Sequence, residues 1–282
     1  MTGFIIVDKA AGASSAQEVA KIKRLVNTPC GHMGTLDPMA SGVLPVAIGN
    51  SARLFDYFLD KRKTYLATFR FGVDSDTLDT TGALSEHAGS IPSKSQILSV
   101  LGEFIGEIDQ IPPKYSAKNV SGKRAYQLAR SGVEFSLPPK KVKIYSIKLL
   151  GQPSEDSFDF EIECGGGTYI RSIARDLAAR LETCAVMSAL KRTKSGLFSI
   201  DNAVSTKDLT VDNIKNFIIP TDSVLPYESI TPDEKSAKKL FNGLSVYFDK
   251  ADGIYKIYSI DGSFYGLAEV AQSNLKVRKK LC

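Results

Sequence analysis

An aspartate and a histidine stand close together in a stretch rich in glycine and proline, residues 31–49. The glycines permit backbone angles that other residues avoid, and the prolines fix φ, a mixture that suits one irregular path. Because Pro38 follows Asp37, this aspartate is pushed toward extended geometry, so its carboxylate stands on a stiff backbone. The apolar residues 43–48 then predict a buried segment. A polar loop anchored by such a core could hold Asp37 and His32 for chemistry.

Asp37 and His32 also have ordinary structural interpretations. An Asp-Pro pair often starts a turn, and a single histidine beside glycines is often a hydrogen-bonded structural residue. The chain has only two histidines, His32 and His87, which excludes a metal site built from several histidines. The residue pattern alone therefore leaves Asp37 either a catalytic carboxylate or a turn residue.

The sequence of residues 31–45, GHMGTLDPMASGVLP, closely resembles the central motif of the TruB family of tRNA pseudouridine-55 synthases. The resemblance implies that Asp37 is the catalytic nucleophile. It also implies that His32 helps to hold the target uridine, flipped out of the T loop of tRNA. The expected partner is the T arm of tRNA, and the reaction is expected to need no cofactor and no metal.

Three further segments resemble motifs of the same family. From pattern alone Tyr65 is a core residue of a strand, with its hydroxyl at the boundary. The resemblance implies that Tyr65 stacks on the target base and that Leu190 lines the base pocket. It also implies that Arg171 pairs with Asp37, whose pKa the positive charge would lower. The segments are residues 63–65, 167–171 and 189–192.

Tyr169 and Lys9 are expected, by the same resemblance, to bind the substrate. A glycine-rich turn between a strand and a helix, such as residues 165–168, can cradle a phosphate, but no Gly-Lys-Ser/Thr follows it, so a nucleotide-hydrolase loop is not predicted. Three aspartates in residues 74–79 could suggest a cation site, but contacts with the backbone of their own loop explain them equally well.

The composition is that of a folded globular protein: 282 residues, 43% apolar and 24% charged. No apolar run approaches the length of a membrane span and no signal-peptide layout is visible, so we expect a cytoplasmic protein. The four cysteines show no Cys-x-x-Cys spacing and are expected to be reduced. The formal net charge is +5, and separate basic clusters favour a polyanionic partner. The clusters lie at residues 21–24, 61–63, 140–143, 191–194 and 276–280.

Apolar periodicity predicts strands and helices along the first 226 residues. A capping box of Ser15 and Glu18 is expected to begin one helix, and Ser93 with Gln96 to begin another. The family resemblance implies an α+β protein with the pseudouridine synthase fold, in which a mixed, mainly antiparallel sheet is flanked by helices. Strands are predicted at 4–7, 63–71 and 158–164, and helices at 51–60, 125–129 and 170–181.

The last part of the chain reads as a separate, β-rich unit. A capping box is expected at residues 231–234, and strands at 255–260 and 264–271 flank Asp261-Gly262, a typical hairpin turn. This unit resembles a short form of the PUA RNA-binding domain. We therefore expect a catalytic domain at 1–226, with an inserted RNA-gripping thumb at about 104–140, and a short PUA-like domain at 227–282.

The resemblance predicts an enzyme that isomerises uridine to pseudouridine at position 55 in the T loop of tRNAs. The expected steps are base flipping, aspartate-dependent cleavage of the glycosidic bond, and reattachment through C5. Two other functions remain open: a guide-RNA-dependent pseudouridine synthase, and a tRNA-folding chaperone without essential catalysis. We expect a monomer that does not bind membranes.

Overall fold

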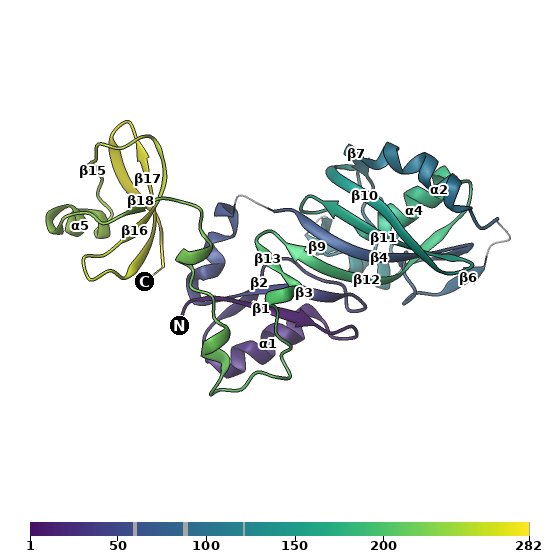
Figure 1. Ribbon diagram of the computed structural model, residues 1–282, viewed down its shortest axis with the longest axis horizontal. Coiled ribbons are helices and arrows are strands. Elements are labelled where there is room, and N and C mark those ends of the chain that lie inside the picture. The colour runs from purple at the N-terminus through teal and green to yellow at the C-terminus, as the bar shows by residue number, and fades with distance from the viewer. Residues whose placement is uncertain (59–60, 87–89, 121, 282) are drawn as a thin grey trace.

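A large sheet and a smaller second sheet form the computed structural model, which describes residues 1–58, 61–86, 90–120 and 122–281 (Figure 1). The large sheet has the order β1-β3-β12-β4-β11-β10-β7, with β2 beside β3 and β13 beside β12. Among the described strands, β3 and β12 pair in parallel and the other neighbours are antiparallel, so the predicted mixed, mainly antiparallel sheet is confirmed. The bounds are β1 Gly3–Lys9, β2 Cys30–His32, β3 Ser41–Ile48, β4 Lys63–Phe71, β7 Gly106–Gln110, β10 Lys140–Ser154, β11 Ser157–Cys164, β12 Ala185–Ser195 and β13 Phe198–Ser199.

One face of the large sheet carries the main core. The helices that cover it contribute Ile22, Ile97 and Ile173, which belong to one buried cluster with the inward residues of the strands. Burial of these apolar faces is the main driving force for the layered arrangement. Within the described residues, no helix is long and apolar enough to cross a membrane. The helices are α1 Ser15–Val26, α2 Lys94–Leu101 and α4 Ile170–Arg180.

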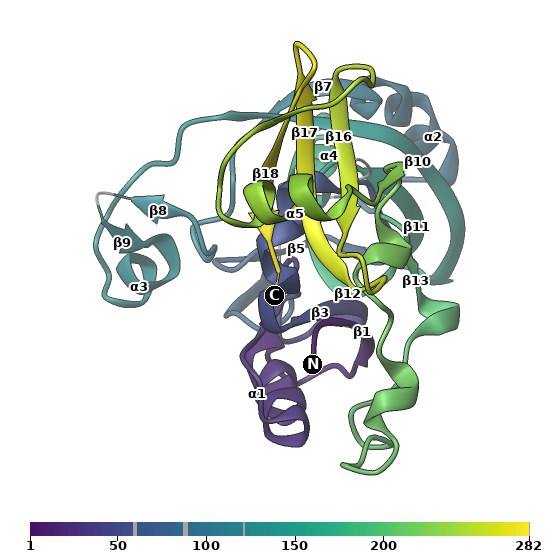
Figure 2. The same cartoon turned by 90° about the vertical axis from the view of Figure 1, so that its left-hand side faces the viewer.

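A small hairpin and a short helix project from the body in Figure 2, within the segment predicted to be a thumb. Tyr115, at the base of this projection, donates its hydroxyl to the Asp76 carboxylate at 3.0 Å. The base of this projection therefore contacts the loop that follows β5. The elements concerned are β8 Asn119–Val120, β9 Lys123–Arg124 and α3 Ala125–Arg130, together with β5 Val73–Ser75 and β6 Leu84–Glu86, which pair with each other.

The second sheet lies at one end of the large one, near the N-terminus, and a second apolar cluster joins the two (Figure 1). Successive residues of β1 point to opposite faces: Ile5 belongs to the main core, whereas Phe4 lies in a second cluster with Leu267 and Leu281 of the second sheet. The second sheet also has an apolar cluster of its own against α5. It has the order β14-β16-β17-β18-β15, with bounds β14 Ser229–Ile230, β15 Val246–Tyr247, β16 Gly253–Tyr258, β17 Phe264–Ala271 and β18 Asn274–Lys280, beside α5 Glu234–Phe241.

The helix starts show where the predicted caps are right and wrong. Ser93 and Gln96 form the predicted capping box of α2. For α1 the predicted pair is wrong, because the capping box is Ser14 with Gln17. Ser15 is instead the first helical residue, and its hydroxyl contacts the backbone of Leu36 in the Asp37 loop.

Two further helices also differ in position from the prediction. The predicted box at residues 231–234 is wrong, because α5 starts after Asp233, whose side chain accepts a hydrogen bond from the Ser236 amide, and Pro232 lies outside the helix. The predicted helix at 51–60 is a 3₁₀ helix at Gly49–Tyr57, and its last two predicted residues lie outside the described residues. The predicted strands at 63–71 and 158–164 are confirmed by β4 and β11.

Because the second cluster joins both sheets, we expect Leu267→Ala to destabilise the whole chain. Leu267 is fully buried, and removing its side chain should lower the free energy of unfolding by about 2–5 kcal/mol. Leu244→Ala, at a leucine of the same segment that is 58% exposed, is the matched control and should change it by less than about 0.5 kcal/mol. Urea unfolding measures both. Equal, small losses would contradict a shared core.

Candidate active site

Asp37 lies in the loop between β2 and β3. The two strands pair with His32 opposite Val46, so the loop is closed at its base. At the start of β3, Gly42 has a φ of 96°, and a Cβ at this position would overlap the carbonyl oxygen of Arg192 on β12. Only glycine fits here, because the backbone is left-handed and the next strand is in contact. The sequence motif thus fixes the path of the loop.

Arg192 holds this loop from β12. Its side chain is fully buried; Nε donates to the carbonyl of Val43 at 2.7 Å, and Nη2 donates to the carbonyl of Gly34 at 3.0 Å. A buried guanidinium needs such partners, since an unpaired buried charge is strongly destabilising. Arg192 and the loop carbonyls therefore stabilise one another.

Lys9 holds the loop from the opposite side. It is fully buried, and its ammonium donates to the carbonyls of Ala13 at 2.6 Å and Pro38 at 3.2 Å. Burial lowers the pKa of Lys9, against the raising effect of Glu18. The predicted substrate-binding residue thus lies beneath the loop, bonded to the residue that follows Asp37. This placement fits a residue that positions the loop rather than one that contacts a substrate.

Asp37 meets Arg171, the second residue of α4. Arg171 Nε lies 3.0 Å from Asp37 Oδ2, and Nη1 lies 3.4 Å from Asp79 Oδ2. The same guanidinium donates to the carbonyls of Thr77 at 2.9 Å and Tyr115 at 3.0 Å. A planar guanidinium with several fixed donors suits this divided contact, which a lysine cannot reproduce. Arg171 thus joins α4, the Asp37 loop, the loop after β5 and the base of the thumb.

The Asp37 carboxyl is a buried group with one open side. Its side chain is 34% exposed, whereas those of Arg171 and Asp79 are about 5% exposed. Burial raises the pKa of Asp37 above its ordinary value; Arg171 opposes the rise, and Asp79 adds to it. The expected lowering by Arg171 therefore acts, but removal from water outweighs it.

Tyr65 and Leu190 lie on neighbouring strands next to this loop. Tyr65 on β4 stands opposite Arg192 on β12, and Leu190 belongs to the same buried cluster as Tyr65 and Leu36. Burial raises the pKa of Tyr65, so its hydroxyl stays neutral. The structure thus places Tyr65, Leu190 and the residue before Asp37 in one buried apolar cluster.

His32 and Tyr169 flank the site without a contact to Asp37 in the described residues. The Nδ1 atom of His32 is buried and has no hydrogen-bond partner within them, and burial lowers the pKa of this histidine, leaving it neutral at pH 7. The backbone of Tyr169 is held at both its amide and its carbonyl by the side chain of Gln110. This pair of bonds sets the start of α4, and hence the place of Arg171.

The sequence did not lead us to predict that Arg192, Asp79 and Gln110 are parts of the site. In the sequence, Arg192 belongs to a basic cluster and to the segment 189–192 that resembles a family motif, but no role was predicted for it. Its spacing of two residues from Leu190 along a strand is the signal that could have placed it inward. Asp79 accepts hydrogen bonds from Thr77 and Thr81, as the loop-backbone interpretation expected, and also reaches Arg171. Among the described residues no group of His, Cys, Asp or Glu could hold a metal ion.

The family model for the "TruB family pseudouridylate synthase (N terminal domain)" matches residues 23–170, which include Asp37 and Tyr65. The chain belongs to the TruB family. "tRNA pseudouridine synthase B" of Clostridium perfringens is 36% identical, over 100% of this chain and 99% of that protein. The protein of the same name from Clostridium tetani is 38% identical over the full length of both. That from a Caulobacter strain is 40% identical over 83% of this chain and 75% of its own.

A solved structure is similar in fold to this chain over almost its full length. A chain of the "Cbf5-Nop10-Gar1 Complex" superposes with a TM-score of 0.71 at 25% identity, covering 99% of this chain and 85% of the other. The pseudouridine synthase fold expected from the motifs is therefore confirmed, second sheet included.

Arg171→Lys tests the guanidinium contact of this family member. We expect single-turnover pseudouridine formation to fall by at least about 100-fold, since losing charge-assisted hydrogen bonds removes about 3 kcal/mol of orienting interaction. Arg175→Lys, one turn later on α4 and bonded to Asp176 and to the carbonyl of Ile111, is the control and should stay within about threefold of wild type. Near-normal activity of Arg171→Lys would make Arg171 purely structural.

The raised pKa of Asp37 predicts an early acid limb in the pH–rate profile. The anion is present above that pKa and is lost as the pH falls through it, so the single-turnover rate should decline at a higher pH than an ordinary aspartate would give. Asp79, Arg171 and Lys9 carry the other charges that act on this carboxyl. Rates at saturating RNA, with circular dichroism to check folding, measure the limb. A flat profile down to the ordinary aspartate range would contradict it.

Proposed function

We propose that this protein converts uridine to pseudouridine at position 55 in the T loop of tRNA, without a guide RNA. The ion pair of Asp37 with Arg171, set in a loop that the backbone and two buried cations hold, is the observation that carries the proposal. The full-length likeness to proteins named tRNA pseudouridine synthase B supports tRNA as the substrate.

Asp37 acts as the anion that assists glycosidic cleavage. In this isomerisation the bond from N1 to ribose C1′ breaks, the detached uracil turns, and a bond from C5 to C1′ forms, while the C5 proton is lost and N1 gains one. The reaction is redox-neutral, and its atoms balance. Arg171 aims the carboxylate by a short contact and limits the rise of its pKa, which favours the anion.

The apolar surface beside Asp37 receives the flipped base. A base must leave its stack to reach a buried carboxylate, and Tyr65 packs on it while Leu190 lines the pocket wall. Tyr65 is almost fully buried, so it excludes water that could intercept the detached uracil. His32, whose Nδ1 lacks a partner in the described residues, helps to hold the displaced nucleotide, and Tyr169 contacts the substrate beside Arg171. Lys9 acts indirectly, through the loop.

The rest of the chain serves RNA binding. Residues 1–226 form the catalytic domain, whose thumb at about 104–140 grips the T arm, and residues 227–282 form a short PUA-like domain that adds contacts with the RNA. The five-stranded sheet of the described residues with a basic last strand, β18, supports this assignment. The protein acts as a monomer in the cytoplasm.

A guide-RNA-dependent synthase is the second candidate, because the superposed chain comes from the structure titled as a Cbf5–Nop10–Gar1 complex. The higher identity, over the full chain, to the relatives named tRNA pseudouridine synthase B favours the first. Incubating the purified protein with an unmodified tRNA transcript, without guide RNA, and mapping pseudouridine separates them. Modification at position 55 supports the proposal, whereas modification only after a guide RNA is added overturns it.

Asp37→Asn tests catalysis against a chaperone role. The change keeps the shape of the side chain and removes the anion, so turnover should fall by more than about 1,000-fold while the affinity for tRNA changes by less than about threefold. Gel-shift and single-turnover assays measure the two. The control Asp208→Asn, at an exposed aspartate, should match wild type. If Asp37→Asn keeps turnover within tenfold of wild type, Asp37 is not the catalytic group.

A further inference from the structure

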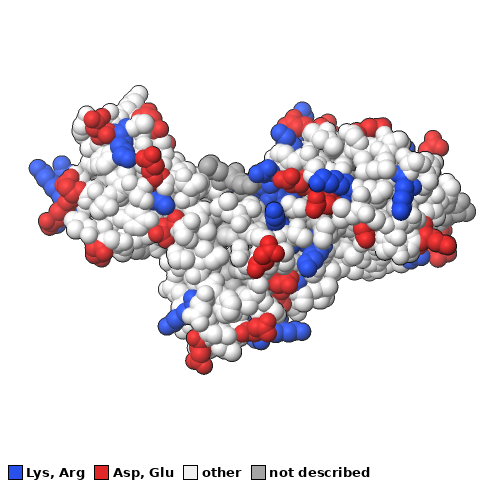
Figure 3. Space-filling view, in the orientation of Figure 1, with Lys and Arg blue, Asp and Glu red and all other residues white. Residues whose placement is uncertain are grey.

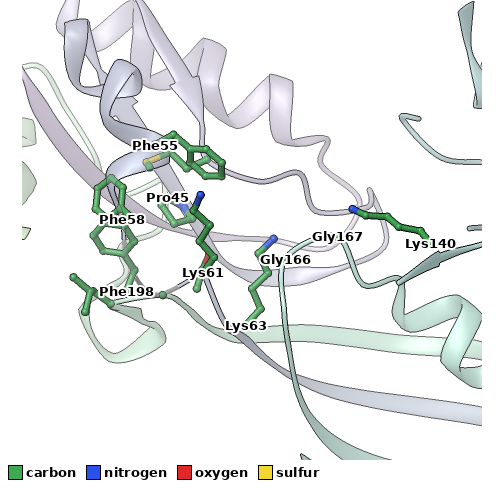
Figure 4. A pocket seen from close by; sticks show the side chains of 13 residues that line it. Pro45, Phe55, Phe58, Lys61, Lys63, Lys140, Gly166, Gly167 and Phe198 are labelled. Atoms are coloured by element: carbon green, nitrogen blue, oxygen red, sulfur yellow. The ribbon is translucent and has the colours of Figure 1, made fainter. Parts of the chain in front are cut away.

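A pocket of about 310 Å³ lies beside the Asp37 loop, and the catalytic assignment above does not use it (Figure 4). Its walls come from the loop itself, through Met33, from the start of β4, and from the glycine-rich turn before α4. Asp37 is not among the lining residues. In Figure 4 the rings of Phe55, Phe58 and Phe198 gather at one end, and the lysine side chains follow toward Gly167.

The pocket is strongly cationic. Lys61, Lys63 and Lys140 line it, and no acidic residue is among its described lining residues. Lys61 has one distant carboxylate, that of Asp56 at 4.0 Å. Lys63 and Lys140 have no hydrogen-bond acceptor within the described part of the chain. Figure 3 shows basic and acidic side chains interspersed on this face of the molecule.

Lys63 gains most from an anionic ligand. Burial and, after it, the neighbouring charge of Arg192 together lower the pKa of Lys63 to about 8. A lysine whose charge is disfavoured by burial and by a second cation is stabilised when an anion enters beside it. Its position two residues before Tyr65 puts both side chains on the same face of β4. The cationic end therefore adjoins the surface proposed to receive the target base.

The glycine-rich turn that the sequence singled out forms one wall. Gly166 and Gly167 precede α4, and their amides have no hydrogen-bond acceptor in the described residues. Gly167 has a φ of 85°, and a Cβ there would lie 2.7 Å from the ammonium of Lys140. A side chain at this position would displace that ammonium. Free amides beside unpaired ammonium groups suit a phosphate.

The opposite end suits a planar base. Phe55 is 43% exposed and lies under the ammonium of Lys61, 5.4 Å from the ring centroid. Phe58 and Phe198 line the same pocket, contact each other, and belong to the buried cluster shared with the second sheet. An exposed aromatic ring next to cations is the usual platform for an unstacked base and its backbone.

We propose that this pocket binds one unpaired nucleotide of the RNA substrate, adjacent to the target uridine, with its phosphate at Lys63 and Lys140 and its base on Phe55. The proposal rests on the RNA substrate of the proposed function. We favour substrate RNA over a free nucleotide because the pocket is continuous with the catalytic site. Met33 belongs to the Asp37 loop, and Gly167 lies four residues before Arg171. A nucleotide in the pocket would thus hold the RNA strand at the entrance to the catalytic site.

A double-mutant cycle between protein and RNA tests the base contact. The probe is a T-arm stem-loop RNA, either intact or made abasic at the nucleotide on one or the other side of the target. Phe55→Ala should weaken binding of the intact RNA about tenfold and have no further effect on the RNA that is abasic at the bound nucleotide. Phe217→Ala, at a ring that is 40% exposed outside the pocket, should leave every affinity unchanged. Additive effects at both flanking positions would overturn the proposal.

The phosphate contact has its own test. Lys140→Ala should weaken binding about tenfold and reduce the slope of log affinity against log salt by about 0.7, the value for one phosphate of a single strand. Lys148→Ala, on the same strand but paired with Glu161, is the control and should change neither quantity. An unchanged salt slope in Lys140→Ala would overturn the phosphate assignment.

Three outcomes separate this proposal from its alternatives. If free nucleoside monophosphate binds equally well to the protein alone and to the protein saturated with stem-loop RNA, the pocket serves a free nucleotide and the proposal fails. If wild type modifies the RNA but the cycle is additive, the pocket assignment fails while the proposed function stands. If wild type forms no pseudouridine but the cycle is non-additive, the function fails and the nucleotide pocket stands.

Discussion

The buried guanidinium of Arg171 is the constraint on which the site depends. A charge with about 5% of its side chain exposed must be paired, and this one is paired with two carboxylates and two carbonyls from separate segments. The need to pair this buried charge therefore fixes the position of each partner. Because the Tyr115 carbonyl is one of them, the base of the thumb cannot shift without changing the environment of the Asp37 carboxylate.

The Asp37 loop is held mainly through its backbone. Arg192 and Lys9 are fully buried cations that bond carbonyls on the two sides of the loop, and the hydroxyl of Ser15 bonds the Leu36 backbone. Backbone contacts leave the Asp37 side chain free to meet a substrate while its origin stays in place. Such preorganisation reduces the reorganisation needed during the reaction. Rigidity here comes from these buried polar groups together with the packing of Leu36 and Ala40 in the main core.

The sequence predicted what depends on local pattern and on whole motifs. Alternation located β4 and β11, and the resemblance located Asp37, Arg171 and their pairing, which the structure reproduces at 3.0 Å. It did not predict the roles of Arg192 or Lys9, because their partners lie far along the chain: Arg192 meets Gly34 158 residues away. The predicted cap of α1 was wrong for the same reason, because the hydroxyl of Ser15 bonds the distant Leu36 backbone instead of capping the helix. Rules based on neighbouring residues cannot predict a contact with a residue that is distant in the sequence.

The position of Arg171 between two carboxylates also sets how the site can respond to RNA. Binding of a base over Asp37 removes its remaining water, and this raises the pKa of the carboxyl further, which favours the neutral acid. Asp79, nearly fully buried in the free protein, gains little additional desolvation. The attraction of Arg171 for Asp37 grows as water leaves, because the local dielectric falls. The two effects oppose each other at Asp37, so Arg171 is the group that limits the rise of the Asp37 pKa as water leaves.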